Sequence, residues 1–292
     1  MEYALLFKEG EEKLNNAGIS EASLDARLLL EHVCGTDHNT LLSHGDMDVE
    51  DGKVSAYREM IGKRMERIPV AYIIGSCEFM GIDFDVTCDV LIPNQDTETL
   101  SEEALRYIHD GMNMLDLCTG SGCIALSILK YTNDTRAVGT DLSEKALLIA
   151  EKNAARLGMS ERFKAVKADI FPDKEELSKI FESEDNTSDI KFDIIVSNPP
   201  YIPTAVIETL EPEVKTYEPY MALDGSDDGL LFYRRIIPGA KEFLYKSGYL
   251  LLEIGYDQGP AVKELMEQNG YKDVQVIKDL GGNDRVVSGC FY

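Results

Sequence analysis

A buried apolar run, a glycine-rich turn and a second apolar run of helical character follow one another near the middle of this chain. Residues 112–117 read Met-Asn-Met-Leu-Asp-Leu, a composition typical of a buried parallel strand. Residues 118–122 read Cys-Thr-Gly-Ser-Gly, and residues 123–129 continue as a helix-like apolar run. Because glycine lets the backbone bend tightly and approach a ligand, this order predicts a strand, a ligand-binding turn and a helix with free N–H groups at its start.

The glycine turn alone does not identify its ligand. Gly120, Gly122 and Ala125 satisfy the loose pattern G-x-G-x-x-G/A, which nicotinamide and S-adenosylmethionine sites share. Asp116 favours the second ligand, because a carboxylate would repel a pyrophosphate but attract the ammonium of a methionine moiety, directly or through water. We therefore expect S-adenosylmethionine to be bound by the strand end and the turn: Asp116, Cys118, Thr119, Gly120, Ser121 and Gly122.

Two later strands end in acidic residues that suit the rest of such a cofactor. Residues 136–141 form an apolar run that ends at Asp141, whose carboxylate could accept both ribose hydroxyls. Residues 163–167 form a third strand, after which Asp169 could accept from the adenine amino group and Ile170 could cover the ring. Both acids also have ordinary structural uses, as the N-terminal acid of a helix and as a turn residue.

A fourth apolar run, residues 192–197, ends directly in Asn198, Pro199, Pro200 and Tyr201. Proline lacks an N–H and fixes φ, so the two prolines hold the chain extended and leave neighbouring carbonyls free to accept hydrogen bonds. A planar amide or aromatic amine has two N–H donors, which the Asn198 side chain and the Pro199 carbonyl could bind. We predict Asn198, Pro199 and Tyr201 as catalytic, Pro200 as substrate-binding, Tyr201 as stacking on the substrate and Asn198 as also contacting the cofactor.

With these motifs the chain resembles the class I S-adenosylmethionine-dependent methyltransferases, and more narrowly the peptide chain release factor N5-glutamine methyltransferases of the HemK-like family. The resemblance covers nearly the whole chain, and its motifs lie at residues 25–30, 69–75, 116–122, 198–202, 217–219, 222–225, 229–235 and 282–287. It implies methyl transfer to the side-chain amide of the glutamine in the Gly-Gly-Gln loop of release factors. The quartet alone is also found in a ribosomal-protein glutamine methyltransferase and in adenine-N6 DNA methyltransferases.

The chain departs from the family pattern at two positions. Asn94 stands where relatives usually carry arginine, so a fixed cation near the cofactor is lost. Ile170 stands where relatives often have an aromatic residue and can give only apolar cover. The change at Asn94 also motivates an alternative, in which the chain keeps this fold but is a binding protein without catalytic activity. A nicotinamide dehydrogenase is a more distant alternative, since no acid or hydroxyl pair suggests hydride transfer.

Strands and helices alternate from about residue 96 onward, which predicts an α/β fold: a doubly wound, Rossmann-like methyltransferase sheet, mostly parallel with a late antiparallel strand. Residues 1–70 have helical spacing, with Gly35 as a helix stop, and predict a small N-terminal helical domain for substrate recognition. Residues 71–95 suggest a β-hairpin linker, and residues 96–292 the methyltransferase domain. We further expect a solvated helix and loop over 173–189 and a long loop without secondary structure over 203–226.

Composition narrows the choice of partner. The 292 residues carry a formal net charge of −24, which repels phosphate backbones and favours a basic protein partner such as a release factor. Nucleic acid is therefore not expected as substrate. The six cysteines and four histidines show no metal-binding spacing, and no apolar stretch approaches the length of a membrane span. We predict no metal, no disulfide, no membrane association, a cytoplasmic location and a monomer.

Overall fold

The computed structural model describes residues 1–181 and 190–292, and the chain divides into two compact units. Unit 1 consists of Met1–Ser76 together with Glu211–Tyr217, and unit 2 consists of Cys77–Leu210 together with Glu218–Tyr292. No helix among the described residues is both long enough and apolar enough to cross a membrane. Each unit has its own hydrophobic core.

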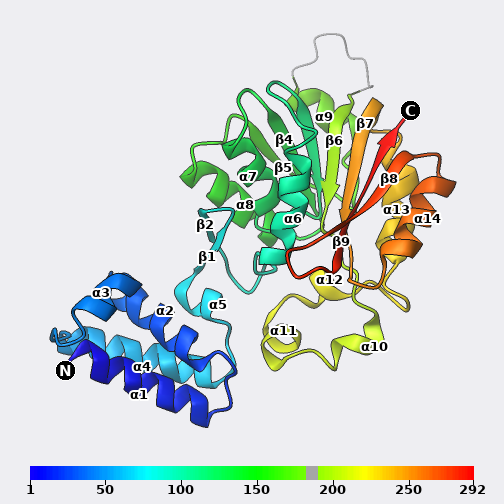
Figure 1. The fold of residues 1–292 in the computed structure, drawn as a ribbon. Helices are drawn as coiled ribbons and strands as arrows, with labels where there is room; N and C mark the ends of the chain where they lie inside the picture. The colour runs from blue at the N-terminus through cyan, green and yellow to red at the C-terminus, as the bar shows by residue number, and fades with distance from the viewer. Residues whose placement is uncertain (182–189) are drawn as a thin grey trace. The chain divides into compact units, whose positions relative to one another are not determined.

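Unit 1 is helical. Its N-terminal segment forms α1 (Tyr3–Asn16), α2 (Ala22–Cys34), α3 (His38–Ser43), α4 (Asp51–Met65) and α5 (Val70–Ile74) (Figure 1). Gly35 ends α2 with φ 65°, which confirms the predicted helix stop. The core contains Leu6, Leu29, Tyr57 and Ile61, all almost fully buried.

A buried ion cluster attaches a distant segment to these helices. Arg64 on α4 contacts Asp25 on α2 at 2.6 Å and Glu213 at 2.9 Å, and Arg67 contacts the same Glu213 oxygen at 3.3 Å. Glu213 lies on α11 (Pro212–Tyr217), far along the sequence. Tyr217 adds a hydrogen bond from its hydroxyl to the Glu66 carbonyl at 2.6 Å. These contacts explain why α11 belongs to unit 1.

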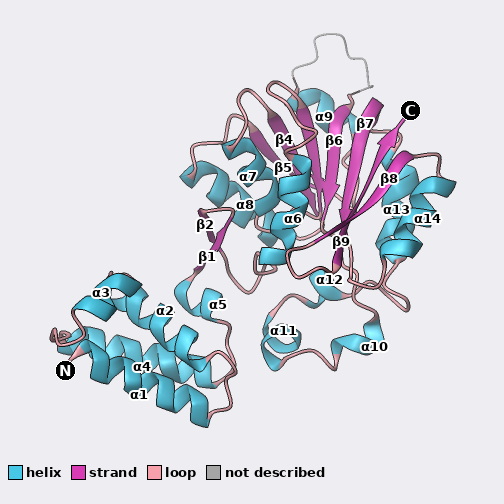
Figure 2. Cartoon of the chain, in the orientation of Figure 1, coloured by secondary structure: helices cyan, strands magenta, loops and turns pink. Residues whose placement is uncertain are grey.

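Unit 2 contains a seven-stranded sheet with the order β5-β4-β3-β6-β7-β9-β8 (Figure 2). Strands β3 to β7 are parallel, whereas β9 is antiparallel to β7 and β8. The predicted fold class, mostly parallel with a late antiparallel strand, is confirmed. The strands are β3 (Asn113–Leu117), β4 (Arg136–Asp141), β5 (Phe163–Lys167), β6 (Phe192–Ser197), β7 (Leu244–Glu253), β8 (Lys272–Lys278) and β9 (Asp284–Phe291).

Helices cover both faces of this sheet, because successive strand residues point to opposite sides. Met114 on β3 packs in one core cluster, and the next residue, Leu115, packs in the other. The first cluster includes residues of α6 (Gln95–Ala104), α7 (Cys123–Lys130) and α8 (Glu144–Arg156). The second includes residues of α9 (Lys174–Ile180), α13 (Leu231–Ala240) and α14 (Gly259–Gln268).

The connecting segments differ in part from expectation. Within the predicted hairpin linker, β1 (Ser76–Phe79) and β2 (Ile82–Asp85) form a separate two-stranded sheet. The expectation of a loop without secondary structure over 203–226 is wrong, because prolines there start short helices. These are α10 (Thr204–Ile207), α11 and α12 (Tyr220–Leu223). In the predicted solvated insertion, α9 supplies the helix, and residues 182–189 lie outside the described part of the chain.

The ion cluster of unit 1 gives the first testable prediction. Arg64→Met leaves Asp25, whose pKa burial already raises, without its buried partner. The variant should lower the free energy of unfolding by about 3 kcal/mol, as for other broken buried ion pairs. Urea denaturation of the full chain measures this, and amide hydrogen exchange should rise in residues 211–217.

The neighbouring residue Lys63 provides a matched control. Its pair with Glu59, at 2.8 Å, is exposed on both sides. Lys63→Met should therefore change the free energy of unfolding by less than about 0.5 kcal/mol. Equal effects of the two substitutions would contradict the importance given to the buried cluster.

Candidate functional site

The two sequence motifs meet where the order of strands reverses. Strand β3 leads to β4 on one side, while β6 returns to lie on its other side, with Leu117 paired to Ser197. The Ser197 hydroxyl donates to the Leu117 carbonyl at 2.7 Å and fixes these two strand ends together. The glycine turn after β3 and the Asn-Pro-Pro-Tyr quartet after β6 therefore begin side by side. Such switch points are where open α/β sheets bind ligands.

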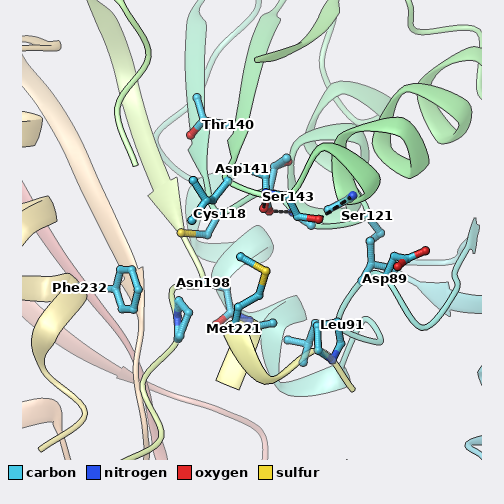
Figure 3. A pocket seen from close by; sticks show the side chains of 18 of the residues that line it. Asp89, Leu91, Cys118, Ser121, Thr140, Asp141, Ser143, Asn198, Met221 and Phe232 are labelled. Atoms are coloured by element: carbon cyan, nitrogen blue, oxygen red, sulfur yellow. Dashed lines mark hydrogen bonds between the residues drawn. The ribbon is translucent and has the colours of Figure 1, made fainter. Parts of the chain in front are cut away.

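A cavity of about 470 Å³ lies at this edge of the sheet, within unit 2 (Figure 3). Its volume falls in the usual range for small-molecule sites. Most of the predicted site residues line it: Cys118, Thr119, Gly120, Ser121, Asp141, Asp169, Ile170, Asn198 and Pro200. Four predicted residues are not among those that line it: Asp116, Gly122, Pro199 and Tyr201.

The glycine turn is held by hydrogen bonds that its backbone N–H groups donate. The Thr119 N–H donates to the Thr140 carbonyl at 2.8 Å, and the Gly120 N–H donates to Asp141 Oδ2 at 3.0 Å. Gly120 has φ 55°, and a Cβ there would meet no heavy atom within 4 Å, so the backbone faces open space. Gly122, with φ 80°, would place a Cβ 3.2 Å from that of Ala150. The first glycine thus gives access to the cavity, and the second allows helix packing.

Asp116 lies behind the turn rather than in the cavity wall. Its side chain is fully buried, and its Oδ2 accepts from the Thr119 hydroxyl at 2.7 Å. Its other oxygen, Oδ1, makes no hydrogen bond within the described part of the chain. Burial raises the pKa of Asp116 to about 7, although Thr119 and the Ala125 N–H act against this rise. A direct contact with a ligand in the cavity would need the turn to open.

Asp141 and Ile170 close the next part of the cavity wall. The Asp141 carboxylate accepts from the N–H groups of Gly120 and Ser143, and burial raises its pKa. Ile170 is buried and has φ 73°, a rare backbone conformation for a β-branched residue. Its carbonyl accepts from the Thr140 hydroxyl at 2.7 Å, which holds it there. Asp169, by contrast, is exposed and pairs with Arg235 at 2.9 Å.

The quartet after β6 divides between the cavity and the protein interior. Asn198 faces the cavity (Figure 3). Its Nδ2 donates to Thr97 Oγ1 at 3.2 Å. The Tyr201 ring instead packs against the second core cluster, and its hydroxyl donates to Glu253 at 3.2 Å. Gln258 binds the Tyr201 carbonyl at 3.0 Å. The structure thus brings Asn198 and Pro200 to the cavity and holds Tyr201 beneath them.

Sequence reasoning pointed only to Asn94 in a second wall of the cavity. Residues 89–94 and 219–222 also line it, together with Thr97 and Phe232. The Ile92 N–H donates to Glu218 Oε2 at 3.4 Å, which joins the two segments, and burial raises the pKa of Glu218 to about 7. Asn94 lines the cavity and caps α6 by accepting from the Asp96 N–H at 2.9 Å. The motif at residues 217–219, which runs into the lining segment 219–222, was the sequence signal that could have located this wall.

Two family models match the chain. Residues 6–75 match the model described as PrmC N-terminal domain, and residues 108–284 match the one described as Methyltransferase domain. The release factor glutamine methyltransferase of Geobacter sulfurreducens is 40% identical over 94% of this chain and 92% of its own length. The enzyme of that name from Clostridium botulinum is 38% identical over 98% of both chains.

A solved structure shares the fold. A methyltransferase from Pyrococcus furiosus superimposes with a TM-score of 0.51 and 19% identity. The match covers 78% of this chain and 98% of that one.

The burial of Asp116 predicts a pH-dependent stability. Its folded pKa of about 7 lies above its ordinary value of 3.8, so its contribution to stability is present at low pH and is lost as pH rises through 7. Asp116→Asn cannot ionise, so the free energy of unfolding of the variant relative to wild type should rise by a few kcal/mol between about pH 5 and about pH 8. Urea denaturation at the two pH values measures this. A pH-independent difference would contradict the buried carboxyl.

Proposed function

We propose that this chain, which belongs to the family of release factor glutamine methyltransferases, methylates the side-chain amide nitrogen of the glutamine in the Gly-Gly-Gln loop of a release factor. The methyl donor in this proposal is S-adenosylmethionine. The observation that carries the proposal is the position of Asn198, which lines one cavity together with the glycine turn.

The residues around the cavity fit this cofactor. Gly120 leaves open space where a side chain would stand, and the Asp141 carboxylate lies at the same wall. Asp116 keeps one buried oxygen without a hydrogen bond behind the turn. We assign the methionine moiety to the glycine turn, the ribose to Asp141 and the adenine ring to the apolar cover of Ile170. When bound, the cofactor supplies an electrophilic methyl group on a sulfonium.

The acceptors of the quartet suit a glutamine amide. An amide nitrogen is a weak nucleophile because its lone pair is delocalised, so catalysis depends on holding it in line with the electrophile. The Asn198 side-chain oxygen would accept one amide hydrogen. The Pro199 carbonyl, which does not line the cavity in this structure, would accept the other after turning toward the substrate. Outside the helices and strands, no backbone N–H of the described residues donates to the Pro199 carbonyl. The Asn198 side-chain oxygen and the Pro199 carbonyl would also stabilise the positive charge that develops on the amide nitrogen.

The charge of the chain and its helical unit bear on the protein substrate. A net charge of −24 favours a basic partner and disfavours a nucleic acid. We assign recognition of the release factor to unit 1, whose segment 6–75 matches the PrmC N-terminal domain. Because release factors act at the ribosome, this proposal places the protein in the cytoplasm.

Mass spectrometry provides the direct test. The protein is incubated with S-adenosylmethionine and a release factor, and the factor's Gly-Gly-Gln peptide is then analysed. We expect the mass of one added methyl group on the glutamine. A parallel incubation with DNA tests the adenine-N6 reaction, and methylation of DNA alone would overturn the proposal.

Substitution of Asn198 tests its proposed role. Asn198→Ala removes the side-chain acceptor but leaves the glycine turn, so turnover should fall by about two orders of magnitude while cofactor affinity stays nearly constant. Steady-state kinetics and calorimetry measure the two quantities. Asn133→Ala, in an exposed turn away from the cavity, is the control and should match wild type. Near-normal turnover of Asn198→Ala would remove the assigned role.

A further inference from the structure

The buried side chain of Gln258 joins two segments that lead to the cavity. Gln258 is the N-cap residue of α14 and is only 8% exposed. Its Nε2 donates to the Tyr201 carbonyl at 3.0 Å and to the Gly229 carbonyl at 3.3 Å. Its Oε1 accepts from the Gly255 N–H at 2.9 Å. A side-chain amide has two N–H donors, and here both bind backbone carbonyls.

These backbone partners fix the direction in which the Gln258 amide points. A carbonyl can only accept and an N–H can only donate, so the three partners admit one orientation of the amide. A half-turn would place Oε1 against the carbonyls of Tyr201 and Gly229, and Nε2 against the N–H of Gly255. Buried polar groups left without a partner are costly, so this alternative is disfavoured. Gln258 is therefore a fixed link between the two segments.

The segment of residues 223–229 packs directly on the backbone of Tyr201. A Cβ at Gly225 would lie 2.8 Å from the Tyr201 Cα, and a Cβ at Gly229 would clash with the Tyr201 carbonyl oxygen. Gly229 also has φ 72°, a conformation that favours glycine. The Gly225 N–H donates to the Ile202 carbonyl at 2.8 Å. The end of the quartet and this segment thus meet backbone to backbone.

Both segments lead to side chains that line the cavity. On one side, the two prolines of the quartet connect Tyr201 to Asn198 through a stiff stretch of chain. On the other side, segment 223–229 leads into α13, which carries Phe232. Asn198 and Phe232 both line the cavity (Figure 3). A change in the contact between the two segments would therefore alter the gap between these two side chains.

We propose that Gln258 is a positioning residue that sets the gap between Asn198 and Phe232, into which the substrate amide enters. The quartet is fixed at its start by β6 and at its end by Gln258, and the prolines transmit the second constraint to Asn198. Glu253 accepts from the Tyr201 hydroxyl at 3.2 Å, but this bond holds the side chain rather than the backbone. The inference rests on the proposed methyl transfer and adds a residue outside the cavity wall that keeps the acceptor in place.

Gln258→Glu tests the link without any need for methyl transfer. The carboxyl group keeps the shape of the amide but offers at most one hydrogen, so at least one of the two carbonyls loses its donor. Hydrogen-exchange mass spectrometry should show faster exchange in residues 198–204 and 222–231, and unchanged exchange in residues 118–125. Unchanged exchange in residues 198–204, or an equal rise throughout unit 2, would overturn the proposal.

The same variant should separate turnover from cofactor affinity. We expect kcat to fall about tenfold, while the dissociation constant of S-adenosylhomocysteine changes less than about twofold, because the glycine turn is untouched. Thermal denaturation verifies that the variant is folded at the assay temperature, and Gln258→Met, which removes both donors, replaces it if it is not. A normal kcat, or an equal loss of S-adenosylhomocysteine binding, would refute the role of Gln258.

Gln268→Glu is the matched control, since it makes the same chemical change on the same helix. Gln268 lies at the end of α14, is exposed, and donates from Nε2 to Glu264 Oε1 at 2.9 Å. Its substitution should leave kcat and the exchange of residues 198–204 as in wild type. Losses equal to those of Gln258→Glu would mean that any added acid on this helix impairs the protein, and would count against the proposal.

A double-mutant cycle separates positioning from general damage. In the Asn198→Ala background, Gln258→Glu should change the single-turnover rate less than about twofold, because no acceptor remains to be positioned. A full tenfold loss in that background would contradict the role of Gln258. If the wild type transfers no methyl group to the release factor while exchange in Gln258→Glu rises as expected, the proposed function fails and the link stands, so the two failures are distinct.

Discussion

The pairing of β3 with β6 is the constraint on which the site depends. Leu117 lies opposite Ser197, and the Ser197 hydroxyl binds the Leu117 carbonyl at 2.7 Å. A shift of this register by one residue would reverse the facing of every side chain in the strand and separate the two motifs. Because both strands are buried within the sheet, the hydrophobic core fixes the register. The position of the two motifs at the cavity is thus a consequence of core packing.

The chain passes between its two units at the motif of residues 217–219. Tyr217 is bound through its hydroxyl to Glu66 within unit 1, whereas the next residue, Glu218, accepts from Ile92 in unit 2. The segment that follows lines the cavity with Pro219, Tyr220 and Met221. One continuous stretch therefore connects the helical unit, anchored at Arg64 and Glu213, to a wall of the site.

Local sequence was sufficient to predict a residue's position at the cavity where that position depends on the local backbone alone. The glycine turn and Asn198 were predicted because a strand end, glycines and prolines restrict the chain by themselves. Tyr201 was not placed correctly by sequence, since its direction depends on Glu253, a buried partner on another strand. The attachment of α11 to unit 1 depends on Arg64, which is farther still along the sequence. The edge strand β8 was missed because most of its residues are polar or only partly buried.

A crystal structure of the protein with S-adenosylhomocysteine and a Gly-Gly-Gln peptide tests the central claim most directly. The account predicts that the glutamine NH₂ donates one hydrogen to Asn198 Oδ1 and one to the Pro199 carbonyl, beside the ligand at the glycine turn. It also predicts that Asn198 Nδ2 still donates to Thr97. A glutamine side chain bound away from Asn198, or an Asn198 amide with its nitrogen toward the substrate, would contradict it.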